Sequence, residues 1–181
     1  TGDGWIGFWA GADYRRGRES YREFNESLAP NEADKRTHGN SVVFQTVMAK
    51  ESVTFPEVPW ATEVSKDYAQ MANIPKKEWD PAHYWEYGQG LDVLQGAEHI
   101  RDHLFQAIYG TYATFKATYP QAANLQLTWV GHIAARGESR RFIGDYTLNQ
   151  NDVAAARVFP DAVAISMKNW FCLHYIQPKY D

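Results

Sequence analysis

The chain has 181 residues, of which 44% are hydrophobic, 15% aromatic and 22% charged, a balance that is typical of globular proteins and excludes a disordered chain. The net charge of −4 argues against a general nucleic-acid-binding protein, and a single cysteine excludes a disulfide framework within the chain. No apolar run approaches the roughly 20 residues that span a membrane.

The first forty residues predict short elements joined by turns. Residues 1–3 read as a tight turn, and Asp3 is placed to cap an apolar helix over 4–12. Residues 21–28 carry apolar side chains at helical spacing before Pro30. Because the chain starts at a threonine and its last residues follow no closing element, we expect it to be part of a longer protein.

The central segment predicts strands around one long helix. Residues 41–49 are rich in β-branched side chains and predict a strand, 52–55 a returning strand, and 83–87 a short aromatic strand. Between them, 56–81 holds four prolines and predicts a long loop that covers a site or a partner surface. Residues 97–118 place apolar side chains on one helical face and predict the long helix.

The last third predicts further short elements. Residues 125–133 predict a strand with Leu125, Leu127 and Trp129 on one face, and 140–144 predict another. Asn149 and Asp152 resemble a capping pair that opens a helix through residue 157. Strands at 162–165 and 170–176 complete an α+β fold, with a mixed or mainly antiparallel sheet and a few helices.

The polar segment 136–141 (RGESRR) is the densest charged stretch near a glycine turn. Arginine binds carboxylate or phosphate through its fixed fork of donors, so this segment is a candidate ligand site. A structural Arg–Glu lattice is the alternative. The glycines of residues 1–4 (TGDG) permit a close backbone approach to a ligand, although a plain turn explains them as well.

Other chemistries find little support in the sequence. His99 and His103 are four residues apart on the long helix but do not complete an H-E-x-x-H motif, so we expect a solvated pair and no metal site. Cys172 lies in an apolar stretch and predicts a buried thiol. No G-x-G-x-x-G motif, phosphate loop or serine-nucleophile elbow occurs.

Several short motifs occur in one order along nearly the whole chain: 1–4 (TGDG), 9–12 (WAGA), 24–30 (FNESLAP), 39–41 (GNS), 85–88 (WEYG), 91–92 (LD), 129–131 (WVG), 138–141 (ESRR), 144–146 (GDY), 159–164 (FPDAVA) and 174 (H). Together they resemble a bacterial family of FAD-dependent oxidoreductases, some of whose members carry the label putative xanthan lyase. The ESRR and GDY motifs are the most specific part of this resemblance.

The resemblance implies a two-domain flavoprotein in which this chain is a single substrate-side domain without the Rossmann nucleotide-binding part. Residues 1–12 would end the FAD-binding segment, and 41–176 would form the sheet with the long helix 97–118. The full protein would transfer a hydride from an organic or carbohydrate-derived substrate to FAD. Its partners would be that substrate and the Rossmann domain of its own chain, with no nucleic acid. The isolated chain is expected to be inactive and not to bind FAD alone, and export in a bacterium is one option for its compartment.

The resemblance also implies roles for individual residues. The expected cofactor-side residues are Thr1, Gly2, Asp3 and Gly4. The expected catalytic residues are Arg140, Arg141 and His174. That Arg140 and Arg141 face flavin or substrate is our own inference from two guanidiniums beside a glycine turn, and not part of the resemblance. The expected substrate-binding residues are Arg136, Glu138, Tyr146 and Trp85. The chain departs from the family pattern at Gly137, where the family has arginine, and at residues 167–173, which lose an acidic residue and two glycines.

Two alternatives without flavin remain open at this stage. One is a carbohydrate-binding module that uses an exposed aromatic platform of Trp60, Trp79, Tyr84 and Trp85. The other is a polysaccharide lyase, which needs a base to remove the proton α to a uronate carboxylate. Histidine, tyrosine and arginine are present, but no spacing assembles them into such a site.

Overall fold

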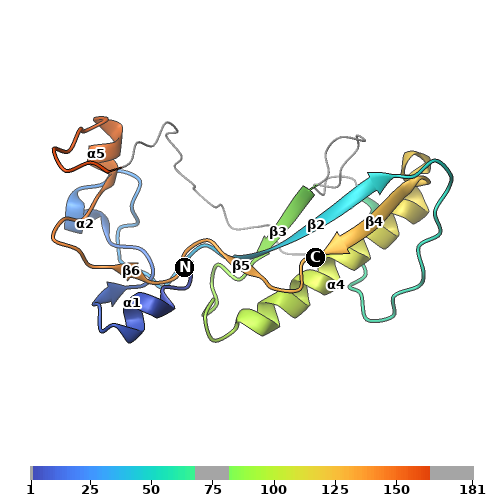
Figure 1. Ribbon diagram of the computed structural model, residues 1–181, viewed down its shortest axis with the longest axis horizontal. Helices are drawn as coiled ribbons and strands as arrows, with labels where there is room; N and C mark the ends of the chain where they lie inside the picture. Colours follow the sequence, from blue (N-terminus) through green and yellow to red (C-terminus); the bar gives the residue numbers. More distant parts are fainter. Residues whose placement is uncertain (1, 68–81, 164–181) are drawn as a thin grey trace. The chain divides into compact units, whose positions relative to one another are not determined.

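The computed structural model describes residues 2–67 and 82–163, and within them the chain forms two compact units. Unit one combines residues 2–38 with 138–163, and unit two comprises the described residues between 39 and 137. The elements and their order along the chain are shown in Figure 1. Each unit is built from its own local contacts and is described separately.

The sheet of unit two is organised around β2 (Asn40–Met48). This strand pairs antiparallel with β3 (Ala82–Tyr87) on one side and with β4 (Leu125–Val130) and the short β5 (Ala135–Arg136) in its remaining pairings. Alternate side chains of β2 are buried, as the period of two in a half-buried strand requires. Val42 and Phe44 thereby face the hydrophobic core.

Helix α4 (Ala97–Thr118) packs against β2 and β3, and its bounds are those that the apolar periodicity predicts. Its buried stripe includes Ile100, Leu104 and Ile108, which join the core with the strands. A second cluster surrounds Tyr112 and Phe115 and includes Ala122 of the short 3-10 helix η1 (Pro120–Ala122) and Leu125.

The segment before β3 lies along α4, and Gly110 makes this contact possible. A Cβ atom at position 110 would come within 1.8 Å of the Thr62 carbonyl oxygen, so only glycine fits without movement of the backbone. The Thr62 amide donates to the Gln106 carbonyl at 3.1 Å, and the Thr114 hydroxyl donates to the Val64 carbonyl at 2.9 Å. The described part of the predicted loop 56–81 therefore covers this helix, and residues 68–81 lie outside the described residues.

Two strand predictions in unit two need correction. Residues 52–55 form no strand, and the Val53 amide donates to the Ala123 carbonyl at 3.0 Å rather than to a neighbouring strand. In β4 the register shifts, so that Gln45 pairs with Trp129 and Thr46 with Leu127. This bulge reverses the alternation after Leu127, and the Trp129 side chain is 47% exposed instead of facing the core.

Unit one contains short elements. Helix α1 (Trp5–Trp9) is shorter than the predicted 4–12, and α2 (Tyr21–Phe24) ends early because Asn25 takes a left-handed conformation with φ 54°. Strands β1 (Tyr14–Arg15) and β6 (Arg141–Phe142) form one antiparallel pair, so the predicted strand 140–144 is reduced to two residues.

Helix α5 (Gln150–Ala154) confirms the predicted cap. The Asn149 side chain accepts from the Asn151 and Asp152 amides, and the Asp152 carboxylate accepts from the Asn149 amide. Residues 162–163 are not in a strand, and the rest of the strands predicted at 162–165 and 170–176 lies outside the described residues, as does Cys172.

The described residues thus form a mixed α+β structure with antiparallel sheets and few helices, as predicted. Of the helices in this part of the chain, none has the length and apolar character needed to cross a membrane.

Candidate functional site

The turn of residues 2–4 is hydrogen-bonded to residues 139–140, which lead into β6. The Ser139 hydroxyl donates to the Gly2 carbonyl at 2.8 Å, and Arg140 Nη1 donates to the Asp3 carbonyl at 2.5 Å. Gly4 has φ +63°, a conformation that side chains rarely adopt, and a Cβ atom there would meet the Arg140 Cβ at 3.1 Å. The glycine turn and the ESRR motif, more than 130 residues apart, therefore form one structural feature.

Arg140 is enclosed by aromatic rings as well as bonded to the turn. Its guanidinium carbon lies 4.2 Å from the ring centroid of Trp5, 4.6 Å from that of Phe8 and 5.4 Å from that of Tyr14. Such cation–π contacts stabilise a partly desolvated guanidinium. We call Arg140 with these three rings the arginine box. Within the described residues, Arg140 Nε is buried and has no hydrogen-bond partner.

Arg141 points into a different set of contacts. Its Nη1 donates to Glu19 at 2.8 Å, its Nη2 donates to the Gly17 carbonyl, and its Nε lies 3.3 Å from a Glu138 oxygen. Burial alone would raise the pKa of Glu19, but the hydrogen bond and charge of Arg141 outweigh it and hold that pKa below its usual value. Arg141 and Glu138 thus form the Arg–Glu lattice that the sequence left as an alternative.

Tyr146 belongs to a third polar cluster in the same unit. Its hydroxyl donates to the Asp152 carboxylate at 2.7 Å, and Arg157 Nη1 lies 2.8 Å from the Tyr146 oxygen and 2.9 Å from Asp152. The hydrogen bond from Tyr146 is the main reason why the pKa of Asp152 is lowered, and the same bond raises the pKa of Tyr146. A tyrosine with this pKa is a hydrogen-bond donor rather than a base.

Trp85 and Arg136 belong to unit two, whereas the clusters described above belong to unit one. The Trp85 side chain is 6% exposed and packs in the hydrophobic core, and Arg136 Nε donates to the Val93 carbonyl at 3.4 Å. The predicted site residues therefore fall in both units, and Thr1 and His174 lie outside the described residues. The predicted roles of all these residues stay predictions.

The aromatic platform of the alternative hypothesis is not a single exposed surface. Trp60 is 52% exposed, but Trp85 is in the core, and nothing is described for the side chains of Trp79 and Tyr84.

The histidines of α4 do not form a solvated pair. The His103 ring stacks on Tyr87, with centroids 3.9 Å apart, because position 103 borders the apolar stripe that starts at Ile100. Burial, with a smaller effect of His99, lowers the pKa of His103. Across residues 2–67 and 82–163, no group of three or more potential metal ligands comes together.

Sequence reasoning did not find the three rings of the arginine box. Trp5 and Phe8 were assigned only to an apolar helix, although their spacing of three residues puts both rings on one side of α1. Tyr14 carries no local signal, since only the pairing of β1 with β6 brings it to Arg140.

FAD, which the resemblance implies, fits this turn as one edge of a binding site. Gly2 is exposed and without a side chain, and the buried Arg140 Nε is a donor whose hydrogen-bonding capacity no described residue uses. The Gly2 and Asp3 carbonyls are already bonded to Ser139 and Arg140, and the Asp3 carboxylate accepts from the Trp5 amide at 3.4 Å, so the groups that would meet the cofactor are the Gly2 backbone and the guanidinium. The described residues hold no glycine-rich loop between a strand and a helix that would bind the dinucleotide phosphates.

Comparison with known proteins gives one finding. Residues 1–171 match the model of the family described as FAD dependent oxidoreductase. Neither a curated protein nor a solved structure gives a significant match. The match spans both compact units, including the glycine turn and the arginine that holds it. The chain belongs to the FAD dependent oxidoreductase family.

Proposed function

We propose that this chain supplies the substrate side of an FAD-dependent oxidoreductase that takes a hydride from an organic substrate, with carbohydrate-derived compounds as the first class to screen. When bound, FAD supplies the redox chemistry by accepting two electrons and a proton from the substrate. The chain's own residues position that substrate and set the electrostatics around the cofactor.

The single observation that carries this proposal is the tie between the turn of residues 2–4 and Arg140, inside a chain whose family is FAD-dependent. A guanidinium fixed by three rings and one carbonyl keeps its position without rearrangement, which is what electrostatic stabilisation of developing charge requires. Arg140 would hold positive charge beside the cofactor, while Gly2 lets the backbone approach it closely.

Arg141 has a different proposed role. Because its donors already meet Glu19, Glu138 and the Gly17 carbonyl, it would position the strand that carries Arg140 rather than touch the cofactor. Tyr146, with its ring 51% exposed, remains the proposed substrate contact of this unit.

The first experiment is the visible absorption spectrum of the protein purified from the complete reading frame. We expect oxidised flavin bands that bleach when a reductant is added. A colourless protein that cannot be reconstituted with FAD would remove the cofactor from the proposal.

Three arginine variants then test the role of the turn. Arg140→Ala should lower FAD retention at least tenfold, because it releases the Asp3 carbonyl and empties the arginine box. Arg141→Ala should lower stability but leave the flavin spectrum of the folded protein unchanged. Arg101→Ala is the control, since Arg101 contacts Glu98 and Asp102 on the surface of α4. Normal FAD retention in Arg140→Ala would contradict the proposed contact.

A further inference from the structure

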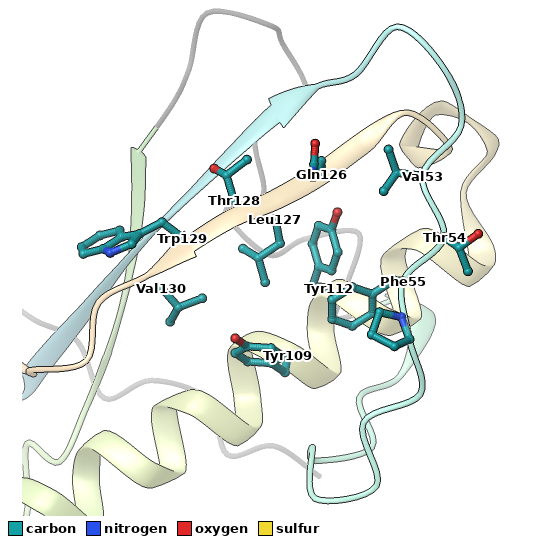
Figure 2. Close-up of a pocket in the computed structure, with 11 residues that line it drawn as sticks. Val53, Thr54, Phe55, Tyr109, Tyr112, Gln126, Leu127, Thr128, Trp129 and Val130 are labelled. Atoms are coloured by element: carbon teal, nitrogen blue, oxygen red, sulfur yellow. The ribbon is translucent and has the colours of Figure 1, made fainter.

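Unit two contains a groove whose lining includes none of the predicted catalytic, cofactor-side or substrate-binding residues. It has a volume of about 480 Å³ and lies between β4, α4 and the extended segment of residues 53–56. Figure 2 shows Leu127 and Val130 pointing toward the helix, where Tyr109 and Tyr112 face them, with Phe55 closing one end. This volume is in the range of small-molecule sites in proteins.

Aromatic rings form part of the groove lining. Tyr109 lies 6.1 Å from Phe55 between ring centroids, and Phe55 lies 4.6 Å from Tyr112. Trp129 is a further lining residue and is 47% exposed, whereas Trp60 lies outside the lining, 4.9 Å from Tyr109. Aromatic faces exposed in this way offer a stacking surface for an apolar face of a ligand ring.

The polar groups of the groove are all uncharged. None of its 11 lining residues is acidic or basic, although 22% of the whole chain is charged. The Tyr109 hydroxyl is one of these uncharged polar groups. The consecutive lining residues 126–130 run along β4, which pairs with β2 and with no other described strand, so backbone donors and acceptors remain at its outer edge.

We propose that this groove binds an uncharged sugar ring, as a free sugar or as one unit of an oligosaccharide. A sugar ring has an apolar C–H face for the aromatic wall, and its hydroxyl groups both donate and accept, as do the free strand edge and the Tyr109 hydroxyl. An anionic sugar or a phosphate would find no cation among the lining residues.

This inference does not rest on the proposed redox function. Sugar binding in the groove needs only unit two, whereas the flavin proposal rests on the turn and Arg140 in unit one. A protein without flavin can therefore still bind the sugar, and a flavoprotein can fail to bind it, so the two proposals fail separately.

The test is a calorimetric titration of the full-length protein with four tetrasaccharides: cellotetraose, maltotetraose and mannotetraose as neutral probes, and tetragalacturonate as the anionic one. We expect at least one neutral probe to bind and the anionic probe to bind at least tenfold more weakly. Tyr109→Ala should weaken binding of the neutral probe at least tenfold. Tyr109→Phe, which keeps the ring, should weaken it about threefold to tenfold through the lost hydrogen bond.

The matched control is Tyr119→Phe, which removes a hydroxyl bonded to the Lys66 carbonyl outside the groove and should leave affinity unchanged. Unchanged far-UV circular dichroism shows that each variant is folded. The proposal is overturned if no neutral probe binds at about 10 mM, if tetragalacturonate binds as tightly, or if Tyr109→Phe and Tyr109→Ala both bind like wild type. It is also overturned if a neutral pentavaline-type peptide binds in place of the sugars, which would assign the free edge of β4 to strand addition.

Discussion

Gly110 occupies the middle of α4, where glycine costs about 1 kcal/mol relative to alanine in helix propensity. The reason for its presence is the Thr62 carbonyl, which a Cβ atom would meet at 1.8 Å. The loop before β3 can therefore approach the helix only at a residue without a side chain. Position 110 thus lowers the helix propensity of the sequence, and in the structure it is where the backbone at Thr62 contacts α4.

We predict that Gly110→Ala lowers the free energy of unfolding by about 1–2 kcal/mol, because the clash with backbone outweighs the gain in helix propensity. Urea denaturation measures this loss. Gly90→Ala is the control, since nothing lies within 4 Å of its Cβ position and it should change stability by no more than about 0.5 kcal/mol. A stabilised Gly110→Ala would show that residues 61–64 do not pack on α4.

The raised pKa of Tyr112 makes the free energy of unfolding depend on pH in the alkaline range. Burial raises the pKa of Tyr112 to about 12, and its hydroxyl donates to the Leu125 carbonyl. The unfolded chain ionises this tyrosine near pH 10 while the folded chain keeps it neutral, so unfolding gains free energy above pH 10. The contribution of Tyr112 is therefore complete below pH 10 and is lost between about pH 10 and 12.

We expect Tyr112 to account for up to about 2–3 kcal/mol of the stability lost over that interval, about half of it by pH 11. Unfolding free energies from urea titrations between pH 8.5 and 12 measure the loss. Tyr112→Phe should be less stable at neutral pH but should have a flatter dependence above pH 10. Parallel curves for the two proteins would contradict the assignment.

At the scale of elements, α5 shows how a short helix is stabilised by its own sequence. Its five residues would be marginal as an isolated helix, but both halves of the capping box are formed. The side chain of Gln150 and that of Asn151 also reach the segment around α2. The cap fixes where the helix begins, and these side chains fix what it packs against.

We predict that Asn149→Ala destabilises unit one by about 1 kcal/mol, since the Asn151 and Asp152 amides lose their acceptor. Hydrogen exchange of these two amides should speed up, which reports the cap directly. The control is Asn31→Ala, an exposed position in the same unit. Equal exchange rates in the two variants would show that the cap does not hold the helix.

The bulge in β4 is an element-scale feature with consequences for the groove. Because one extra residue of β4 stands between the two registers, Leu127 and Val130 both reach the helix side, whereas Trp129 is exposed. Strict alternation would put Trp129 over α4 in place of Val130 and fill part of the groove with its ring. The groove thus depends on a backbone irregularity that periodicity does not reveal.

At the scale of the whole molecule, the chain leaves unit one at residue 38 and returns at 138. Asn40 and Arg136 are paired across β2 and β5, so the two ends of unit two lie side by side. His38 and Glu138 likewise lie 3.8 Å apart at the ends of unit one. Within the described residues, unit two is thus one continuous stretch of chain with its own core, whereas unit one needs two distant stretches.

We predict that residues 39–137 expressed alone fold cooperatively, with a single urea transition and dispersed amide resonances, because both hydrophobic clusters lie within them. When unit two is removed, unit one should fold only if residues 38 and 138 are joined by a short linker. Residues 2–38 alone should remain unfolded. An unfolded 39–137 segment would mean that the core of unit two depends on contacts outside it.

The sequence by itself determined the elements with strong periodic or capping signals. The bounds of α4, the existence of β2, β3 and β4, the cap of α5 and the α+β class followed from apolar spacing and from residue types at helix ends. The family also followed from collinear motifs, because the glycine turn and the ESRR segment carry rare combinations of residues. These signals are local, and local signals can be recognised in the sequence without knowledge of the fold.

Only the tertiary structure decided what these residues contact. It joined the glycine turn to Arg140, enclosed that arginine with Trp5, Phe8 and Tyr14, and directed Arg141 to Glu19 instead. It also buried Trp85, stacked His103 on Tyr87, explained Gly110 and left an uncharged aromatic groove beside β4. Each of these outcomes depends on residues far apart in the chain, and pairing across such distances is set by packing and strand register, which no local pattern encodes.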